Sequence, residues 1–191
     1  MVPVKNMNFR YQLNWPKVTL ACLASAALLC SALASFPPYV KKHLYAAHDI
    51  RGSRAPKIEV TEWLSGGAPK TAGKTVLVDL WATWCSSCKG LIPELNHWST
   101  KFKDRLVVVG ISDEDPKVVR QFLATESMNY HVGVDPKQRL LSKLGVEGIP
   151  HVLVISPDGI VRWQGYPGED ADKLTDQKLA AIIQSGHKPR R

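Results

Sequence analysis

The sequence contains few of the residues that build metal centres. Its 191 residues include four cysteines, three methionines and six histidines, and the methionines do not cluster. The only cysteines apart from Cys85 and Cys88 are Cys22 and Cys30, which lie in an apolar N-terminal segment. A structural zinc site needs a second pair of ligands, and these two cysteines are badly placed to supply it. We therefore expect no structural zinc site.

The sequence also lacks the features of a nucleic-acid-binding protein. Its formal net charge is +8, but no basic helix is predicted and basic residues do not alternate with aromatic ones. Proteins that bind DNA or RNA concentrate positive charge on one face or along one helix. The charge therefore indicates a solvated basic surface, and no nucleic-acid partner is expected.

Apolar side chains, by contrast, are plentiful. They make up 45% of the chain, which is enough for a sizeable core. A chain of this length suits one domain of about 130–150 residues with an N-terminal extension. We see no internal repeats, and we expect disorder only near the ends.

The N-terminus has the pattern of a secretory signal. Basic residues up to Lys17 precede an uncharged run over residues 18–38, whose apolar part ends at Ala34. The small residues around Ala34 provide a cleavage site typical of signal peptides. The alternative is an uncleaved membrane anchor through residues 18–36, although the apolar run is slightly shorter than the roughly 20 residues of a spanning helix.

Both interpretations divide the chain in the same way. Residues 1–34 form a signal peptide or signal anchor, residues 35–55 a linker, and residues 56–187 a folded domain. The linker is predicted because residues 35–55 show no firm hydrophobic periodicity. Both interpretations also place the domain in an oxidising extracytoplasmic compartment, the periplasm, where disulfides form and persist.

Hydrophobic periodicity divides the domain into strands and helices. The apolar run 106–111 and the β-branched run 76–80 are predicted as buried strands. The other predicted strands are 57–64, 130–134, 151–155 and 160–164, the last two joined by a turn at 157–159, and the predicted helices are 86 onward with a kink at Pro93, 116–126, 136–144 and 172–184. This order predicts a mixed central sheet with helices on both faces.

The most specific motif is Cys85-Ser86-Ser87-Cys88, between a predicted strand and a predicted helix. Cys85 is expected at the helix N-terminus, where unpaired backbone N–H groups stabilise a thiolate. Cys88 lies one turn further along the same face, within reach of a disulfide. A purely structural disulfide is the alternative, but a bond that closes so short a loop stabilises little. The pair therefore indicates redox chemistry.

Three segments resemble the thioredoxin superfamily, specifically its TlpA/ResA-like extracytoplasmic thiol:disulfide oxidoreductases. They are Asp79-Leu80-Trp81-Ala82-Thr83-Trp84-Cys85-Ser86-Ser87-Cys88, Gly148-Ile149-Pro150 and Ile155-Ser156-Pro157-Asp158-Gly159. The resemblance covers about residues 56–185. It implies an α/β, thioredoxin-like fold, with a mixed central β-sheet, helices on both faces, an N-terminal strand extension and a central insertion.

The resemblance also implies roles for individual residues. Cys85 is expected to be the exposed nucleophile and Cys88 the buried resolving thiol, so the redox-active disulfide is the only cofactor expected. Pro150 matches the cis-proline of the family. It leaves the backbone of Ile149 free to pair with an extended segment of a partner protein.

Asp79 matches the buried acid of thioredoxins, and the alternative is a carboxylate exposed at the strand end. A carboxyl buried in an apolar strand has a raised pKa and can take the proton of the resolving thiol. By the resemblance, this acid favours a reducing role. The lysine that accompanies it in thioredoxins has no evident equivalent, because residues 107–109 are all valine.

Two further residues beside the motifs are candidates for partner binding. Trp84 is expected at the rim where a partner docks. His151 stands where thioredoxins have threonine. A protonated His151 would stabilise the thiolate and make the disulfide more oxidising, and the alternative is a neutral core histidine. The predicted substrate-binding residues are thus Trp84, Ile149, Pro150 and His151.

The leading hypothesis is an exported thiol:disulfide oxidoreductase that acts on protein thiols and disulfides, more as a reductant than as an oxidant. Candidate partners are apocytochrome c thiols, other secreted disulfide proteins and a membrane electron donor. The alternative is a copper-binding protein with Cys85, Cys88 and His151 as ligands, although no His-x-x-His pair supports it. A peroxidase of the same fold would need a Thr-x-x-Cys context, which Thr83-Trp84-Cys85 does not provide.

Overall fold

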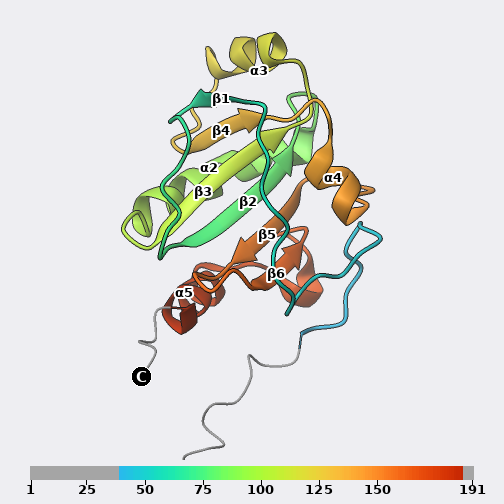
Figure 1. Cartoon of the computed structure of the whole chain (residues 1–191), viewed down its shortest axis with the longest axis vertical. Coiled ribbons are helices and arrows are strands. Elements are labelled where there is room, and N and C mark those ends of the chain that lie inside the picture. Colours follow the sequence, from blue (N-terminus) through green and yellow to red (C-terminus); the bar gives the residue numbers. More distant parts are fainter. Residues whose placement is uncertain (1–38, 187–191) are drawn as a thin grey trace, which may run out of the picture. The chain divides into compact units, whose positions relative to one another are not determined.

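The computed structural model describes residues 39–186 of the chain (Figure 1). The predicted signal peptide or signal anchor at residues 1–34 lies outside the described residues. Within 39–186, no helix is both long enough and apolar enough to cross a bilayer.

The described residues form one mixed sheet of six strands. The strands are β1 (Glu62–Ser65), β2 (Thr75–Trp81), β3 (Leu106–Ser112), β4 (His131–Val134), β5 (His151–Ile155) and β6 (Val161–Gly165). Their order across the sheet is β1-β4-β3-β2-β5-β6. β2, β3 and β4 are parallel, whereas β1, β5 and β6 join their neighbours antiparallel. The predicted mixed sheet is confirmed.

The described helices connect the parallel strands and cover the sheet (Figure 1). They are α2 (Ser86–Lys101), α3 (Pro116–Leu123), α4 (Arg139–Leu144), a 3₁₀ turn (Asp170–Asp172) and α5 (Asp176–Gly186). α2 follows β2 and α3 follows β3, so each parallel pair of strands is joined through a helix.

Helices pack on both faces of the sheet, as predicted. Every residue of β2 and β3 is buried, which is why both strands read as apolar runs in the sequence. On one face, alternate β2 residues such as Val78 pack in one cluster with Leu140 and Leu144 of α4. α2 passes behind β2 and β3 in Figure 1 and contributes the completely buried Leu95 and Trp98.

Local signals set most helix ends. The Asp115 carboxylate caps α3 by accepting a hydrogen bond from the Lys117 N–H at 2.8 Å. Gly145, at φ 60°, ends α4 as predicted. α4 begins at Arg139 rather than at the predicted residue 136, because Gln138 has φ 52°, a left-handed conformation through which no α-helix continues.

The prediction of a linker over residues 35–55 is wrong for the part that the structure describes, 39–55. These residues belong to the same compact unit as the sheet. Ala46 forms an antiparallel bridge with Val146, and Arg54 forms one with Ile160. The folded domain therefore includes residues 39–55 and does not start at residue 56.

Two kinds of contact hold residues 39–55 in place. The Lys42 ammonium is buried, lies 2.9 Å from the Asp172 carboxylate and stacks 3.7 Å from the centre of the Trp163 ring. Further along, the Gly52 N–H donates to the Val161 carbonyl at 2.8 Å. These contacts have no periodic signature because they join residues more than one hundred positions apart. The strand predicted over residues 57–64 is also shorter in the structure, where only Glu62–Ser65 form β1 and pair with β4.

Candidate active site

Cys85 and Cys88 form a disulfide with an S–S distance of 2.06 Å and a Cα–Cα distance of 5.3 Å. β2 ends at Trp81, and a short turn places Cys85 at the N-cap of α2, as the sequence predicts. Cys85 is 5% exposed and Cys88 is 1% exposed. Both cysteines are thus buried in the oxidised protein, and the expectation of an exposed Cys85 is wrong, although Cys85 is the more accessible of the two.

The start of α2 surrounds the Cys85 sulfur with hydrogen-bond donors. The Cys88 backbone N–H donates to Cys85 Sγ at 3.1 Å, and the Ser87 hydroxyl lies 3.4 Å from the same sulfur. The first turn of α2 contains no acidic residue. In the reduced protein, these donors and the positive end of the helix dipole would stabilise a thiolate at Cys85.

The loop before β5 faces the cysteine pair. The Ile149–Pro150 peptide bond is cis, and Pro150 is buried. The Ile149 carbonyl oxygen lies 3.7 Å from Cys85 Sγ, although the two residues are far apart in the sequence. The structure thus brings Ile149 and Pro150 next to the cysteines, as the resemblance implied.

A groove with a volume of about 350 Å³ borders this site. Trp84, next to Cys85, is 70% exposed. Sequence reasoning found Ile149 and Pro150 but missed the two tyrosines of the groove, one of which lies in the supposed linker. The groove is lined by Tyr45, Ser87, Gly148, Ile149, Pro150 and Tyr166.

Asp79 is enclosed in the middle of the sheet. Its residue is 1% exposed, and its neighbours on the adjoining strands are Gly110 of β3 and Val152 of β5. Burial raises the pKa of this carboxyl to about 8. Within the described residues its Oδ1 has no hydrogen-bond partner. The alternative of a solvent-exposed acid is wrong, and Asp79 can bind or release a proton near neutral pH.

Two aromatic side chains beside Gly110 carry buried polar atoms that were not expected from the sequence. A Cβ at Gly110 would lie 3.0 Å from Trp81 Nε1 and 3.2 Å from Tyr130 Cε2. Both Trp81 Nε1 and the Tyr130 hydroxyl lack a hydrogen-bond partner among residues 39–186. Burial, and to a smaller extent the Asp79 carboxyl, raises the pKa of Tyr130. Asp79 therefore has a polar neighbour, a phenol, in a protein without the thioredoxin lysine.

The prediction that His151 contacts a partner is wrong. His151 is completely buried, and its Nε2 lies 3.2 Å from Nε2 of Gln164, which also donates to the His48 carbonyl at 2.9 Å. Burial of the ring lowers the pKa of His151 to about 4, with the nearby Lys42 ammonium contributing. His151 is therefore a neutral core histidine at neutral pH and supplies no positive charge to the thiols.

Glu114 holds the turn that leads into Cys85 and was missed by sequence reasoning. Its carboxylate accepts hydrogen bonds from the Thr83 N–H at 2.6 Å and the Thr83 hydroxyl at 2.7 Å. The Ser112 hydroxyl donates to it at 2.9 Å. Because Thr83 and Trp84 immediately precede Cys85, this carboxylate fixes the approach of the chain to the nucleophile.

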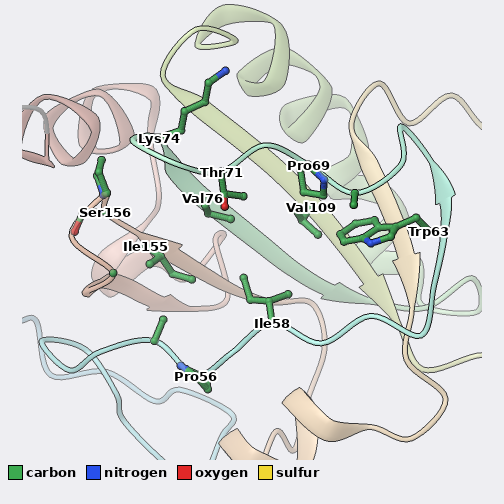
Figure 2. A pocket seen from close by; sticks show the side chains of 14 residues that line it. Pro56, Ile58, Trp63, Pro69, Thr71, Lys74, Val76, Val109, Ile155 and Ser156 are labelled. Atoms are coloured by element: carbon green, nitrogen blue, oxygen red, sulfur yellow. The ribbon is translucent and has the colours of Figure 1, made fainter.

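A second cavity, of about 400 Å³, lies at the other end of β2 (Figure 2). Residues 55–71 pass over the sheet there, and Val76, Val109 and Ile155 point into the space between them. The cavity is lined by no cysteine, histidine or acid, and Lys74 is its charged side chain. These residues do not provide the chemistry of the cysteine pair, which lies beyond the opposite end of β2.

The described part of the chain offers few ligands for the alternative function, metal binding. No three His, Cys, Asp or Glu side chains lie close enough together within residues 39–186 to hold a metal ion. The predicted third copper ligand, His151, is instead hydrogen-bonded through Nε2 to Gln164. The site thus offers two sulfurs and no third ligand of these types.

Comparison with known proteins places the chain in a family. The model of the AhpC/TSA family matches residues 52–164. The thiol-disulfide oxidoreductase ResA of Bacillus anthracis is 30% identical over 115 residues, which cover 58% of this chain and 66% of ResA. The chain therefore matches just under two thirds of the length of that relative. The thioredoxin-like protein YneN of Bacillus subtilis is 24% identical over 164 residues, 81% of this chain and 95% of YneN.

Solved structures agree with this placement. A crystal structure described as the thiol:disulfide interchange protein DsbE of Chlorobium tepidum matches with a TM-score of 0.61 and 28% identity, over 70% of this chain and 97% of that one. A thiol-disulfide isomerase of Corynebacterium glutamicum matches with a TM-score of 0.60 and 18% identity, over 73% of this chain and 98% of that one, and shows the fold alone. Since the family model spans more than half of its sequence, the chain belongs to the AhpC/TSA family, as a member with the thioredoxin-like fold and ResA-like relatives.

Proposed function

We propose that this protein is a thiol:disulfide oxidoreductase that exchanges electrons with the disulfides of partner proteins. The observation that carries the proposal is the position of the Cys85 sulfur, at the N-terminus of α2 and 3.7 Å from the Ile149 carbonyl. The similarity to ResA and to the DsbE structure supports the same activity.

The reduced protein would act in two exchange steps. The Cys85 thiolate attacks one sulfur of a partner disulfide, forming a new S–S bond, and the other partner sulfur leaves as a thiolate. The Cys88 thiolate then attacks Cys85 Sγ, which restores the Cys85–Cys88 disulfide and releases the second partner thiolate. Two electrons pass to the partner, and both of its thiolates take up a proton.

Asp79 serves the second step. Cys88 is buried and must lose its proton before it can attack. A carboxyl whose pKa is raised to about 8 is matched in pKa to a thiol, so the deprotonated form of Asp79 can accept that proton. The proton relay therefore needs no lysine, and Asp79 favours the reducing direction.

The backbone of Ile149 would bind the partner. Its carbonyl stands beside Cys85, and an extended partner segment can form strand-like hydrogen bonds with this loop. The exposed Trp84 indole lies on the rim where the partner approaches. Trp84, Ile149 and Pro150 therefore form the predicted substrate-binding surface without His151.

The basic and then apolar N-terminus supports a periplasmic location, with the chain either cleaved after Ala34 or anchored through residues 18–36. Apocytochrome c and other exported disulfide proteins are the partners that a periplasmic reductant would serve. A membrane electron donor would then return electrons to the Cys85–Cys88 disulfide.

A redox titration of the full chain in detergent tests this function. The protein is equilibrated in dithiothreitol and glutathione buffers, free thiols are alkylated, and the mass is measured. A two-electron transition near the thioredoxin value of about −270 mV supports a reductant, and one near about −120 mV supports an oxidant. The absence of a reversible transition at Cys85 and Cys88 would contradict the oxidoreductase proposal and favour copper binding.

A further inference from the structure

Tyr45 reaches the active-site groove from residues 39–55, the segment that lacks a periodic signature. The chain is fixed on both sides of it. Before Tyr45, the Lys42 ammonium is buried against Asp172 and Trp163. After Tyr45, the Ala47 N–H donates to the Gly145 carbonyl at 2.8 Å. The position of the Tyr45 ring is therefore set by the fold and not by a free terminus.

Tyr45 is held in an unusual backbone conformation. Its φ is 53°, in the left-handed region, which residues other than glycine rarely adopt. Its carbonyl accepts hydrogen bonds from the N–H groups of Glu147 at 2.8 Å and Gly148 at 3.2 Å. These two residues directly precede Ile149, so the strained tyrosine is bonded to the loop that faces Cys85.

The Tyr45 side chain stays at the surface above this loop. The residue is 44% exposed, one of the few large apolar residues to be exposed in the described part of the chain. A Cβ at Gly148 would lie 3.4 Å from Tyr45 Cβ, which is van der Waals distance, so Tyr45 packs directly on this loop. Strained backbone and an exposed aromatic ring are costs that a purely structural contact does not require.

The groove that Tyr45 lines is uncharged and borders the reactive sulfur. Tyr166, which follows β6, is the second aromatic residue of its lining. Ser87, also in the lining, has its hydroxyl 3.4 Å from Cys85 Sγ. None of the residues that line the groove carries a charge, in a protein of net charge +8. An apolar side chain gains free energy from burial there, whereas a charged one loses its hydration without gaining a counter-ion.

We propose that Tyr45 and Tyr166 determine partner specificity by binding a large apolar side chain next to the reacting cysteine of an extended partner segment. This inference rests on the proposed function, because the partner segment must lie along Ile149 for its neighbouring side chain to enter the groove. Aromatic rings provide large, rigid contact area for such a side chain. Residues 39–55 are thus part of the recognition surface.

The reduction rates of two peptides, measured separately, test the inference. The peptides carry an intermolecular disulfide and differ only in the residue next to the cysteine, which is leucine in one and aspartate in the other. The reduced full chain in detergent is mixed with each, and the rate constant of disulfide reduction is measured. We expect the wild type to reduce the leucine peptide at least tenfold faster, and Tyr45→Ala to lower this ratio of rate constants about tenfold.

Two variants control for general damage. Tyr45→Phe keeps the ring and should keep the ratio, whereas Val118→Ala removes a side chain of similar exposure on α3 and should leave the ratio unchanged. A variant that is uniformly slower or less stable reduces both peptides more slowly and leaves the ratio of their rate constants unchanged. Equal rates for the two peptides with the wild type, or an unchanged ratio in Tyr45→Ala, would overturn the inference while leaving the proposed function standing. A wild type that reduces neither peptide would overturn both.

Discussion

The Cys88 N–H donates to the sulfur of Cys85 at 3.1 Å, so the nucleophile caps the helix that carries its own resolving partner. One hydrogen bond thereby links the nucleophile, Cys85, with the resolving thiol, Cys88. The backbone that stabilises a thiolate at Cys85 also keeps Cys88 one helical turn away, at a Cα–Cα distance of 5.3 Å. The order of events follows from this geometry, since Cys85 can react with a partner while Cys88 stays buried.

This order predicts what happens when the resolving thiol is removed. Cys88→Ser should accumulate a covalent complex with a disulfide-bonded partner, because no second thiol can release Cys85. Turnover should fall at least a hundredfold. Non-reducing electrophoresis and intact mass measure the complex. Cys85→Ser is the matched control and should form none, so a complex of similar yield in Cys85→Ser would assign the nucleophile to Cys88.

Asp79 should make stability depend on pH. Its folded pKa of about 8 lies above the ordinary value of 3.8, so the folded state binds this proton more tightly than the unfolded state. Its favourable contribution is complete below about pH 4 and is lost as the pH rises towards 8. The wild type should lose about 1.4 kcal/mol per pH unit in this window relative to Asp79→Asn.

Urea unfolding of the oxidised proteins at pH 5 and pH 7 measures this difference. Asp104→Asn, at an exposed position, should follow the wild type. If wild type and Asp79→Asn change in parallel between the two pH values, burial does not raise the pKa of this carboxyl towards that of a thiol. The proton relay to Cys88 would then lose its basis.

Lys42 should anchor residues 39–55. Lys42→Ala removes a buried ammonium that is paired with Asp172 and stacked on Trp163, leaving a buried carboxylate that keeps its ion pair with Lys178. We expect a loss of about 2–4 kcal/mol in the free energy of unfolding. Residues 39–55 should also become sensitive to proteases. Lys41→Ala, at the exposed neighbouring position, should have almost no effect, and equal behaviour of the two variants would show that the buried pair does not hold the segment.

Glu114 should position the turn before the nucleophile. Glu114→Ala leaves the Thr83 N–H and hydroxyl without their acceptor, which should cost about 1–3 kcal/mol of stability. Because the turn leads directly to Cys85, the rate of Cys85 alkylation in the reduced protein should also change. Glu126→Ala is the control at an exposed position. A Glu114→Ala protein with normal stability and alkylation rate would remove Glu114 from the active-site framework.

The part of the site that is local in sequence could be predicted from the sequence. β2 and α2 follow from one apolar run and one periodic segment, so the position of Cys85 at a helix start needed no knowledge of the rest of the chain. The loop at Ile149 and Pro150 came from the family resemblance and not from local pattern. Here the resemblance supplied a contact that spacing alone could not.

The part that depends on distant contacts could not be predicted. Lys42 reads as a solvated charge, but Asp172 and Trp163 bury it from far along the chain. His151 reads as a candidate ligand or cation, but Gln164 on the neighbouring strand and complete burial make it a neutral core residue. The position of Tyr45 beside the active site could not be predicted either, since a tyrosine with a left-handed backbone conformation has no sequence signal.

The pairing of residues 51–55 with β6 has a consequence for the solution behaviour of the protein. β6 is the last strand on its side of the sheet, and its unpaired backbone groups would offer a template for another chain. The Gly52 N–H and the Ser53 carbonyl occupy both backbone groups of Val161, and the Ala55 N–H bonds to Gly159. The segment thus covers this edge at the Val161 end of β6. A shortened protein that starts at residue 56 would expose the edge and aggregate, even though every residue of the cysteine motif were still present.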